Sequence, residues 1–285
     1  MDRKDFRFFH TLRVRWAEID MQKIVFNGHY LMYFDTAIAD YWRALALPYE
    51  AALHELGGDL YVVKAGLEYK GSARYDELLH VGMKCSRMGN SSMTFTGGIF
   101  KGDQLLITGE LVYVYADPQT QTSKPIPDIL RSTISGYEEG QSSLQLRVGD
   151  WTSMKKMAVS IRTQVFVEEQ KISQEEEWDE WDDGAVHVVA CNGMGFPIAT
   201  GRLLQPSPRV AQIGRMAVIE RMRGQQFGDI ILQKIVSLAR DRGDQEAVLH
   251  AQLSAKNFYR RQGFQRRGDV FLEAGIEHIE MSLKL

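Results

Sequence analysis

The pattern of apolar residues changes character near the middle of this 285-residue chain. Before the midpoint, one helical pattern is followed by a series of alternating runs, whereas after it helical and strand patterns alternate. These two patterns build different layer architectures, because a strand meander and an alternation of helices and strands form different sheets. The length is also about twice that of a common domain. The sequence therefore predicts an α+β protein of two domains with different folds.

The first half predicts one long helix followed by an antiparallel meander. A strand-like run at 6–16 precedes a helical segment at about 27–46, in which aromatic residues recur at helical spacing. Alternating runs follow at 59–70, 78–87, 91–100 and 104–117. Hairpin signals separate some of them, at Gly89-Asn90 and Lys101-Gly102-Asp103. Pro125 and Pro127 precede a short closing helix.

The second half predicts a mixed α/β domain. Its helices are expected at 154–169, at 227–242 and in a segment that ends near 261, and its strands at 144–148, 185–192, 197–204, 211–218, 247–251 and near the end. Between the halves, residues 131–145 contain Gly, Ser and paired Glu but few large apolar residues. We therefore place the boundary near 139–142, with domains at 1–140 and 143–285.

Composition narrows the class of protein. Charged residues make up 25% and the formal net charge is −3, so no overall cationic field favours nucleic acid. No apolar run approaches the roughly 18 residues of a membrane helix. Cys85 and Cys191 lack the spacing of a disulfide framework or a zinc site, which predicts two buried thiols in a reducing compartment and no metal. We expect a cytoplasmic protein that acts on small molecules, with neither nucleic acid nor membrane as a partner.

A carboxylate stands where a hydrolytic site could form. Asp20 follows the first strand-like run, and the long helix begins seven residues later, at Asn27. The N–H groups of a helix N-terminus can polarise a carbonyl oxygen, and Asp20 could attack the carbon or orient a water molecule. An Asp before a helix is also a common cap or turn former.

The spacing of this segment resembles the hotdog-fold acyl-CoA thioesterases of the 4-hydroxybenzoyl-CoA thioesterase type. The matching residues are Asp20, Gln22, Val25, Asn27 and Tyr30, and the resemblance extends over about 6–135. It implies a long helix wrapped by a sheet, Asp20 as nucleophile or base, the backbone N–H of Asn27 as donor to the thioester carbonyl, and a homo-oligomer formed through this domain. Two positions depart from the pattern: Lys23 replaces a frequent Gly, and Gly71-Ser72-Ala73 replaces a common Pro.

Other side chains of the long helix allow two interpretations each. His29 could act as a general base, but on a helix it points about 200° away from Asn27, which favours packing or an interface. The aromatic residues of the helix could line an acyl pocket, but their spacing first predicts a core; they are Tyr30, Tyr33, Phe34 and Tyr41.

The second half contains a strand, a glycine-containing turn and a helix in succession, an arrangement that can bind phosphate. Glycines let backbone amides approach a pyrophosphate, the helix N-terminus contributes its field, and arginines add charge. The candidate cofactor-binding residues are Met216, Ala217, Val218, Arg223, Gly224, Gln225, Gln226, Phe227, Gly228 and Asn257.

Together with the helix around Phe258-Tyr259 and the following Gly263-Phe264, this segment resembles the GNAT N-acyltransferases over about 144–285. The resemblance implies coenzyme A or acetyl-CoA as cosubstrate, with the pantetheine arm along Arg215–Val218 and the pyrophosphate at the turn. It places Tyr259 near the sulfur, where a protonated phenol can act as general acid; without the motif, Tyr259 would be a core residue. Gln226 replaces the first glycine of the motif, and its side chain either crowds the pyrophosphate or donates to it.

An acidic run lies between Glu168 and Asp183, where nine carboxylates accompany one lysine. Such a run is usually a solvated face, and the alternative is that some of these residues hold a cationic acceptor.

These observations predict a bifunctional CoA-linked enzyme. The first domain would hydrolyse an acyl-CoA thioester, and the second would transfer an acyl group, acetyl by expectation, from CoA to an amine. The alternative is an acyl-CoA-binding regulatory protein in which one domain, the second for preference because of Gln226, is inactive.

Overall fold

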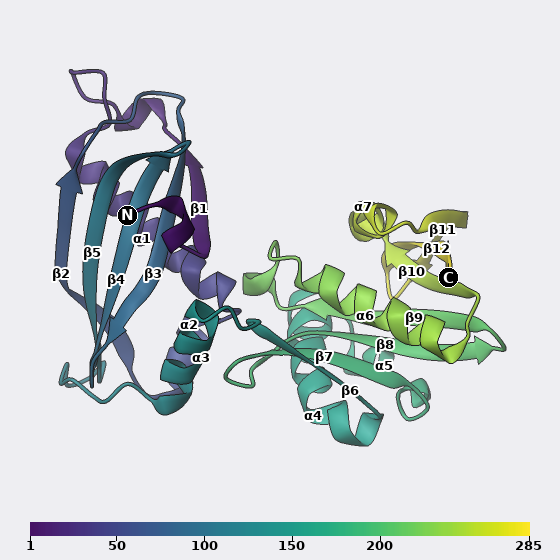
Figure 1. Ribbon diagram of the computed structural model, residues 1–285. Coiled ribbons are helices and arrows are strands. Elements are labelled where there is room, and N and C mark those ends of the chain that lie inside the picture. The colour runs from purple at the N-terminus through teal and green to yellow at the C-terminus, as the bar shows by residue number, and fades with distance from the viewer. The chain divides into compact units, whose positions relative to one another are not determined.

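The computed structural model describes residues 1–285. The chain forms two compact units, Met1–Ser143 and Leu144–Leu285 (Figure 1). None of the helices combines the length and the apolar composition that a membrane span requires.

The first unit is one antiparallel sheet with a long helix along one face (Figure 1). Its strand order is β1-β3-β4-β5-β2, so β1 and β2 are the edge strands. The elements are β1 (Phe8–Arg13), α1 (Asn27–Ala44), α2 (Tyr49–Glu55), β2 (Asp59–Tyr69), β3 (Leu78–Met88), β4 (Ser92–Lys101), β5 (Gln104–Ala116) and α3 (Asp128–Glu138), with 3-10 turns η1 (Arg3–Asp5) and η2 (Trp16–Glu18).

Helix α1 packs closely on the sheet because the strands carry glycine beneath it. A Cβ atom would lie 2.4 Å from the Phe34 ring at Gly97 and 2.6 Å from it at Gly109, so neither position accommodates a side chain. The aromatic residues of α1 that the sequence singled out are all buried, which confirms them as core; they are Tyr30, Tyr33, Phe34 and Tyr41.

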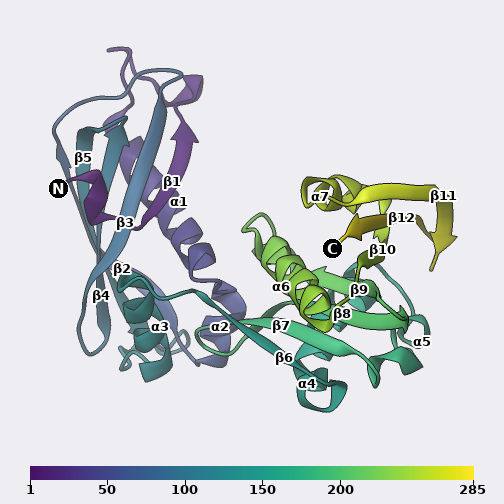
Figure 2. The ribbon, with the colours of Figure 1, turned by 45° about the vertical axis from the view of Figure 1, so that its right-hand side comes forward.

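The second unit is a seven-stranded mixed sheet in the order β11-β12-β10-β9-β8-β7-β6, with α4 and α6 on opposite faces (Figure 2). Only β9 and β10 pair in parallel. The strands are β6 (Leu144–Gly149), β7 (Val186–Asn192), β8 (Pro197–Ser207), β9 (Val210–Val218), β10 (Glu246–Gln252), β11 (Gln265–Glu273) and β12 (Ile276–Lys284).

The helices of this unit connect those strands. They are α4 (Trp151–Arg162), α5 (Gln174–Glu177), α6 (Phe227–Arg242) and α7 (Lys256–Arg261), together with a π-helical segment η3 (Thr163–Glu169) and 3-10 turns η4 (Glu180–Asp182), η5 (Glu220–Met222) and η6 (Leu253–Ala255).

The predicted fold class is confirmed in both units. The segment between them differs from expectation, because α3 continues to Glu138 through residues whose Gly, Ser and Glu content predicts the start of a linker. Leu130, Ile134 and Tyr137 are buried on one side of α3, so the helix contributes to the core of the first unit despite its small and polar residues. The domain boundary of 140–143 stays a prediction.

We predict that the two units fold independently, because each has its own buried core and roughly the size of a common domain. Fragments 1–143 and 144–285 should each unfold in one cooperative thermal transition. Circular dichroism and scanning calorimetry of the purified fragments provide the measurement. A fragment that is soluble but unfolds without a cooperative transition would contradict independent folding.

Candidate active sites

In the first unit, Asp20 lies in a short loop that connects η2 to the start of α1. The N–H of Asp20 donates to Ile24 O at 2.9 Å, and the N–H of Phe26 donates to Glu18 O at 2.9 Å. Lys23 closes this loop in the left-handed region, with φ of 63°. The loop thus holds Asp20 beside the segment that enters the helix.

Asp20 stabilises the turn with one carboxylate oxygen, and the other oxygen is not used in this turn. Its Oδ1 accepts the N–H of Gln22 at 2.8 Å, and this hydrogen bond uses one oxygen only. The N-cap position of α1 is Phe26, which makes no side-chain cap, so Asp20 is a turn former and not the helix cap. Asn27 is the first helical residue, and its N–H therefore has no partner within the helix.

Tyr30 and Tyr69 fix the other side of this helix start. Tyr30 Oη accepts the N–H of Ala73 at 2.8 Å, and Tyr69 Oη donates to Asn27 O at 3.2 Å. Burial raises the pKa of Tyr30, and the nearby carboxylates of Glu77 and Asp20 add to the effect. Tyr30, which the sequence predicts as a core residue and as part of the thioesterase-like motif, therefore also anchors the loop after β2.

Sequence reasoning missed Glu18, a carboxylate just before the loop that is 3% exposed. It accepts hydrogen bonds from Tyr33 Oη at 2.7 Å, from the Arg15 N–H at 2.7 Å and from Arg15 Nε at 2.8 Å. Burial raises the pKa of Glu18, but these donors outweigh it and hold the pKa below the usual value. The pair Tyr33 and Glu18 thus joins α1 to the loop that carries Asp20.

His29 contacts the Phe26 ring, and its Nδ1 is buried without a hydrogen-bond partner. Its interface role stays a prediction.

In the second unit, β9 and β10 separate beside Arg215–Val218, the segment along which the family resemblance places the pantetheine arm. Their pairing ends at Ile213 and Leu249, whereas β9 continues to Val218 and β10 to Gln252. Arg215 has a φ of 51°, and the register of β9 with β8 shifts between Gly214 and Ala217, which marks a bulge. Toward β10, the backbone of Met216, Ala217 and Val218 is therefore free of strand pairing.

The predicted phosphate turn follows β9 and leads into α6. Gly224 and Gln226 both have positive φ, at 82° and 61°, and Gln226 occupies the N-cap position of α6. At Gly228 a Cβ atom would lie 3.5 Å from Phe258, so α7 packs against the first turn of α6. The turn thus presents the N–H groups of a helix start next to α7.

The guanidinium of Arg223 in this turn is already bound within the protein. Its Nη1 and Nη2 donate to the two carboxylate oxygens of Glu169 at 2.7 and 2.5 Å, and its Nε donates to Val218 O at 3.0 Å. An anion at the turn would compete with Glu169 for this guanidinium.

Tyr259 lies in α7 and is 8% exposed. Burial raises the pKa of its phenol, which therefore carries its proton at neutral pH, as a general acid requires. Asn257 is exposed in the same helix. Gln262 Nε2 donates to Asp229 Oδ1 at 2.6 Å and ties the end of α7 to α6.

The acidic run is not a fully solvated face, and this expectation was wrong for its inner residues. Glu177 and Asp182 are each 2% exposed, and they form ion pairs with Arg162, a side chain that is 1% exposed. Arg202 and Arg215 complete the cluster through Asp179, at 2.5 and 2.9 Å. The chain's own arginines therefore pair with Glu177, Asp179 and Asp182, which leaves these three carboxylates without a free charge for a cationic acceptor.

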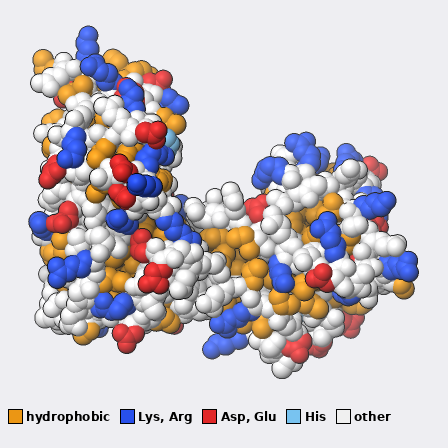
Figure 3. Space-filling model, in the orientation of Figure 1, with side chains coloured by type: hydrophobic (Ala, Val, Ile, Leu, Met, Phe, Trp, Pro, Cys, Tyr) orange, Lys and Arg blue, Asp and Glu red, His pale blue; other side chains and the backbone are white.

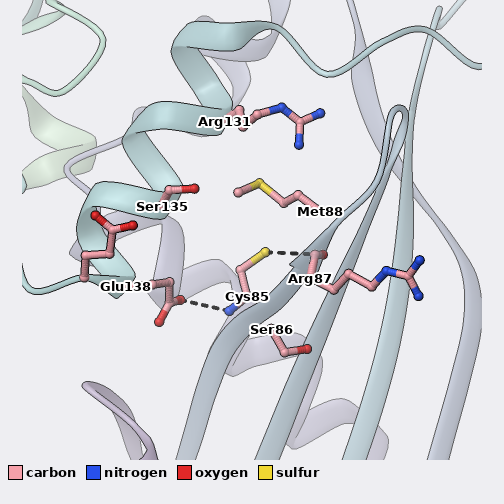
Figure 4. A pocket seen from close by; sticks show the side chains of 8 residues that line it. Cys85, Ser86, Arg87, Met88, Arg131, Ser135 and Glu138 are labelled. Atoms are coloured by element: carbon pink, nitrogen blue, oxygen red, sulfur yellow. Dashed lines mark hydrogen bonds between the residues drawn. The ribbon is translucent and has the colours of Figure 1, made fainter.

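A separate pocket of about 360 Å³ lies in the first unit between β3 and α3 (Figure 4). Cys85 borders it and is only partly buried, in contrast to the predicted buried thiol, whereas Cys191 is buried. Burial and the neighbouring Glu138 raise the pKa of Cys85 to about 12. The thiol therefore stays protonated and is a poor nucleophile at neutral pH.

Comparisons with known proteins assign both units. Residues 153–285 match the family model of the acetyltransferase (GNAT) domain, and residues 22–108 match that of the thioesterase superfamily. An uncharacterized N-acetyltransferase of Bacillus subtilis, YjcF, is 33% identical over 127 residues, which are 44% of this chain and 89% of that protein. The chain therefore belongs to the GNAT acetyltransferases through its second unit, and its first unit matches the thioesterase superfamily model.

Two further matches each cover 45% of the chain. An uncharacterized Bacillus subtilis protein, YyaT, is 30% identical over 131 residues, 45% of this chain and 87% of that protein. A solved structure of a 1,4-dihydroxy-2-naphthoyl-CoA thioesterase from Synechocystis is 18% identical, covers 45% of this chain and 95% of its own, and has a TM-score of 0.42. The family matches to a thioesterase domain and a GNAT domain support a two-domain, acyl-CoA-related protein.

We predict that Glu18→Gln lowers the free energy of unfolding of the first unit by about 1–3 kcal/mol at neutral pH, because it removes a buried, charge-assisted hydrogen-bond acceptor. Since the folded pKa of Glu18 is lowered, its contribution is present above the unfolded pKa of about 4.3 and is lost as the pH falls through the folded value. The difference in free energy of unfolding between wild type and variant should therefore become smaller at acid pH.

Urea unfolding of fragment 1–143 between neutral and acid pH measures this difference, with the exposed Glu55→Gln as control. A constant difference at all pH values would contradict the assigned role of the Glu18 charge.

We predict that Gln226→Gly stabilises the second unit, because glycine adopts positive φ without the cost of roughly 1–2 kcal/mol that other residues incur. The greater backbone entropy of glycine offsets about 0.5–1 kcal/mol of this gain. Gln225→Gly, at a neighbouring position without positive φ, should only destabilise. Thermal unfolding of fragment 144–285 compares the two, and equal destabilisation would contradict the prediction.

Calorimetric titration of the same variants with CoA separates the two interpretations of Gln226. Tighter binding by Gln226→Gly supports crowding of the pyrophosphate, and weaker binding supports donation by the amide.

Proposed function

We propose that this protein is a bifunctional acyl-CoA enzyme of the cytoplasm. The first unit would hydrolyse an acyl-CoA thioester, and the second would transfer an acetyl group from acetyl-CoA to an amine. The observation that carries the proposal is shared by both units: a turn with a left-handed residue leads into a helix whose first N–H groups have no partner within the helix. One such start lies beside Asp20, and the other follows Gly224 and Gln226.

In the first unit, the thioester carbonyl would accept a hydrogen bond from the N–H of Asn27. Asp20 would use the oxygen that Gln22 leaves available either to attack the carbonyl carbon or to hold a water molecule for attack. If Asp20 attacks, the C–S bond breaks to give a mixed anhydride that water then hydrolyses; if water attacks, the acid forms directly. In either case the water molecule supplies the proton that the sulfur takes up, and CoA leaves as the thiol. The helix N-terminus favours the negative charge that develops on the oxygen.

In the second unit, the pyrophosphate of CoA would bind the turn at 223–228, and the pantetheine arm would pair along β9 from Val218 toward Arg215. The free backbone edge of β9 supports this placement. Basic side chains gather over α7, which packs beside the turn, and suit an anionic nucleotide (Figure 3). Tyr259 would donate its proton to the departing sulfur, and Asn257 would contact the cofactor.

The alternative is a regulatory protein whose second unit binds acetyl-CoA without turnover. The ion pair between Arg223 and Glu169 favours it, because the guanidinium is engaged at the cofactor turn. Stoichiometric binding of acetyl-CoA without product, on a panel of amines, would support this alternative.

We also propose that the first unit forms a homo-oligomer. Its edge strand β2 exposes Val62 and Val63, whose exposures of 49% and 61% suit pairing with a second copy.

We predict that Asp20→Asn lowers amine-independent thiol release from acyl-CoA by roughly 10²-fold or more, since the change is nearly isosteric but removes the nucleophile or base. Acetyl transfer to amines should be unaffected. Thiol release is measured on a panel of acyl-CoA esters with and without amines, with the exposed Asp35→Asn as control. Retention of more than half of the hydrolysis rate would remove Asp20 from the mechanism.

A further inference from the structure

The gap between β9 and β10 has a histidine at its edge. Pairing of the two strands ends at Leu249, and His250 is the next residue of β10. The pantetheine arm proposed above runs along β9 away from the phosphate turn, so its thioester end lies toward the bulge at Arg215, where the strands begin to part. His250 therefore borders the part of the gap nearest the reacting carbon.

The faces of the sheet show from which side His250 approaches. On β8, a Cβ atom at Gly201 would contact Ile235 of α6, so Gly201 faces α6. The next residue, Arg202, contacts Asp182 of η4 and therefore points to the opposite face. Leu203 therefore lies on the α6 face. Leu203 pairs with Ile213, and Ile213 pairs with Leu249, so Leu249 lies on the same face because paired residues of neighbouring strands point to the same side.

His250, next to Leu249, thus lies on the face opposite α6. Gln252 confirms this side, because its amide donates at 2.9 Å to Gln170, which follows η3. The phosphate turn leads into α6, so the cofactor reaches the gap from one face and His250 from the other. The face of His250 is the side from which a second substrate can reach the thioester.

A carboxylate orients the imidazole. His250 Nδ1 lies 2.9 Å from Glu273 Oε2 of β11, and the ring packs edge-on against Phe271 at 4.9 Å between centroids. The side chains of His250 and Glu273 are 38% and 46% exposed. With Nδ1 committed to Glu273, Nε2 is left for another partner. This is the arrangement of a base whose second nitrogen is held by an orienting group.

The surrounding charges belong to three strands. Glu280 of β12 lies opposite His250 in the strand register and is paired with Arg267 of β11. His278 of β12 and Arg215 of β9 act on Glu273. The hydrogen bond with Glu273 raises the pKa of His250, and the charges of Glu273 and Glu280 add to this effect.

We propose that His250, oriented by Glu273, is the general base that removes a proton from the amine acceptor; this rests on the acetyltransferase function proposed above. His250 Nε2 takes a proton from the ammonium group, and the nitrogen lone pair forms the C–N bond with the thioester carbon. The C–S bond breaks with its electron pair on sulfur, which takes the proton of Tyr259. The second proton lost by the nitrogen restores Tyr259 through solvent, and the proton on His250 leaves to solvent.

Two acceptors test this assignment on the full-length protein. Alkylamines such as benzylamine and spermidine are protonated at neutral pH and need a base, whereas hydroxylamine is already unprotonated. His250→Gln should lower transfer to the alkylamine by about 10²-fold or more and leave transfer to hydroxylamine largely intact. His278→Gln, a neighbouring imidazole not bonded to Glu273, should leave the ratio of the two rates unchanged. Equal loss on both acceptors, or no loss on either, would overturn the assignment.

The pH profile tests the role of Glu273. The base must be neutral, so kcat/KM for the alkylamine rises with pH through the pKa of His250. Glu273→Gln removes the interaction that raises this pKa, and the acid limb of the profile should move to lower pH. An unmoved limb would show that Glu273 does not act through His250.

A third measurement needs no turnover. The imidazole signals of His250, assigned by comparison with His250→Gln, should shift when acetyl-CoA is added to the full-length protein. Failure to transfer acetyl to any amine, with acetyl-CoA bound and the His250 signals shifted, overturns the proposed transferase function and with it the general-base role. Unmoved His250 signals with acetyl-CoA bound place the imidazole away from the thioester and overturn the assignment alone. Absence of acetyl-CoA binding to the second unit overturns both.

Discussion

Both candidate sites depend on one backbone constraint: the chain must pass through a left-handed residue before it enters a helix whose first N–H groups have no partner within the helix. The entry needs a residue in the left-handed region in each unit, Lys23 before α1 and Gln226 before α6. A non-glycine residue bears a cost of roughly 1–2 kcal/mol in that conformation. The two resembled families favour glycine at these positions, and this chain keeps the conformation without the glycine. The left-handed conformation before each helix is therefore present here without the residue that adopts it most easily.

Paired polar groups anchor segments next to both sites. In the first unit, Tyr33 and Arg15 surround the Glu18 carboxylate, which precedes the loop. In the second, Arg215 sits at the bulge of β9 and pairs with Asp179 of the Arg162 cluster. A buried charge is costly unless it is paired and hydrogen-bonded, so removal of one partner is expected to disturb the position of its neighbours. The sites are thereby coupled to the cores beneath them.

The sequence allowed the elements to be predicted where the signal is local. Helix α6 begins at Phe227 and ends at Arg242, as its apolar spacing indicated, and the hairpin turns of the meander lie where glycine marked them. The same local reasoning identified Asp20 and the phosphate turn as candidates.

Pairings between distant segments could not be predicted in this way. Arg162 and Asp182 are 20 residues apart, and His250 and Glu273 are 23 apart on strands that β12 separates. An acidic run looks the same in a sequence whether water or arginine surrounds it. Continuation of α3 to Glu138 was also missed, since Ser, Thr and Gly in that helix suggested a linker and only packing of Ile134 and Tyr137 explains it.

Where β9 and β10 part, beyond Ile213 and Leu249, the backbone N–H and C=O groups that face the gap have no partner strand. Water must satisfy these backbone groups in the free protein, whereas an extended ligand with amide groups can replace that water and complete the sheet. Under the proposed function, the cofactor is then a structural part of the second unit as well as a reactant. By mass action, the resistance of that unit to unfolding rises with the concentration of the free cofactor. Its lifetime in a cell would thus follow the supply of the molecule that it consumes.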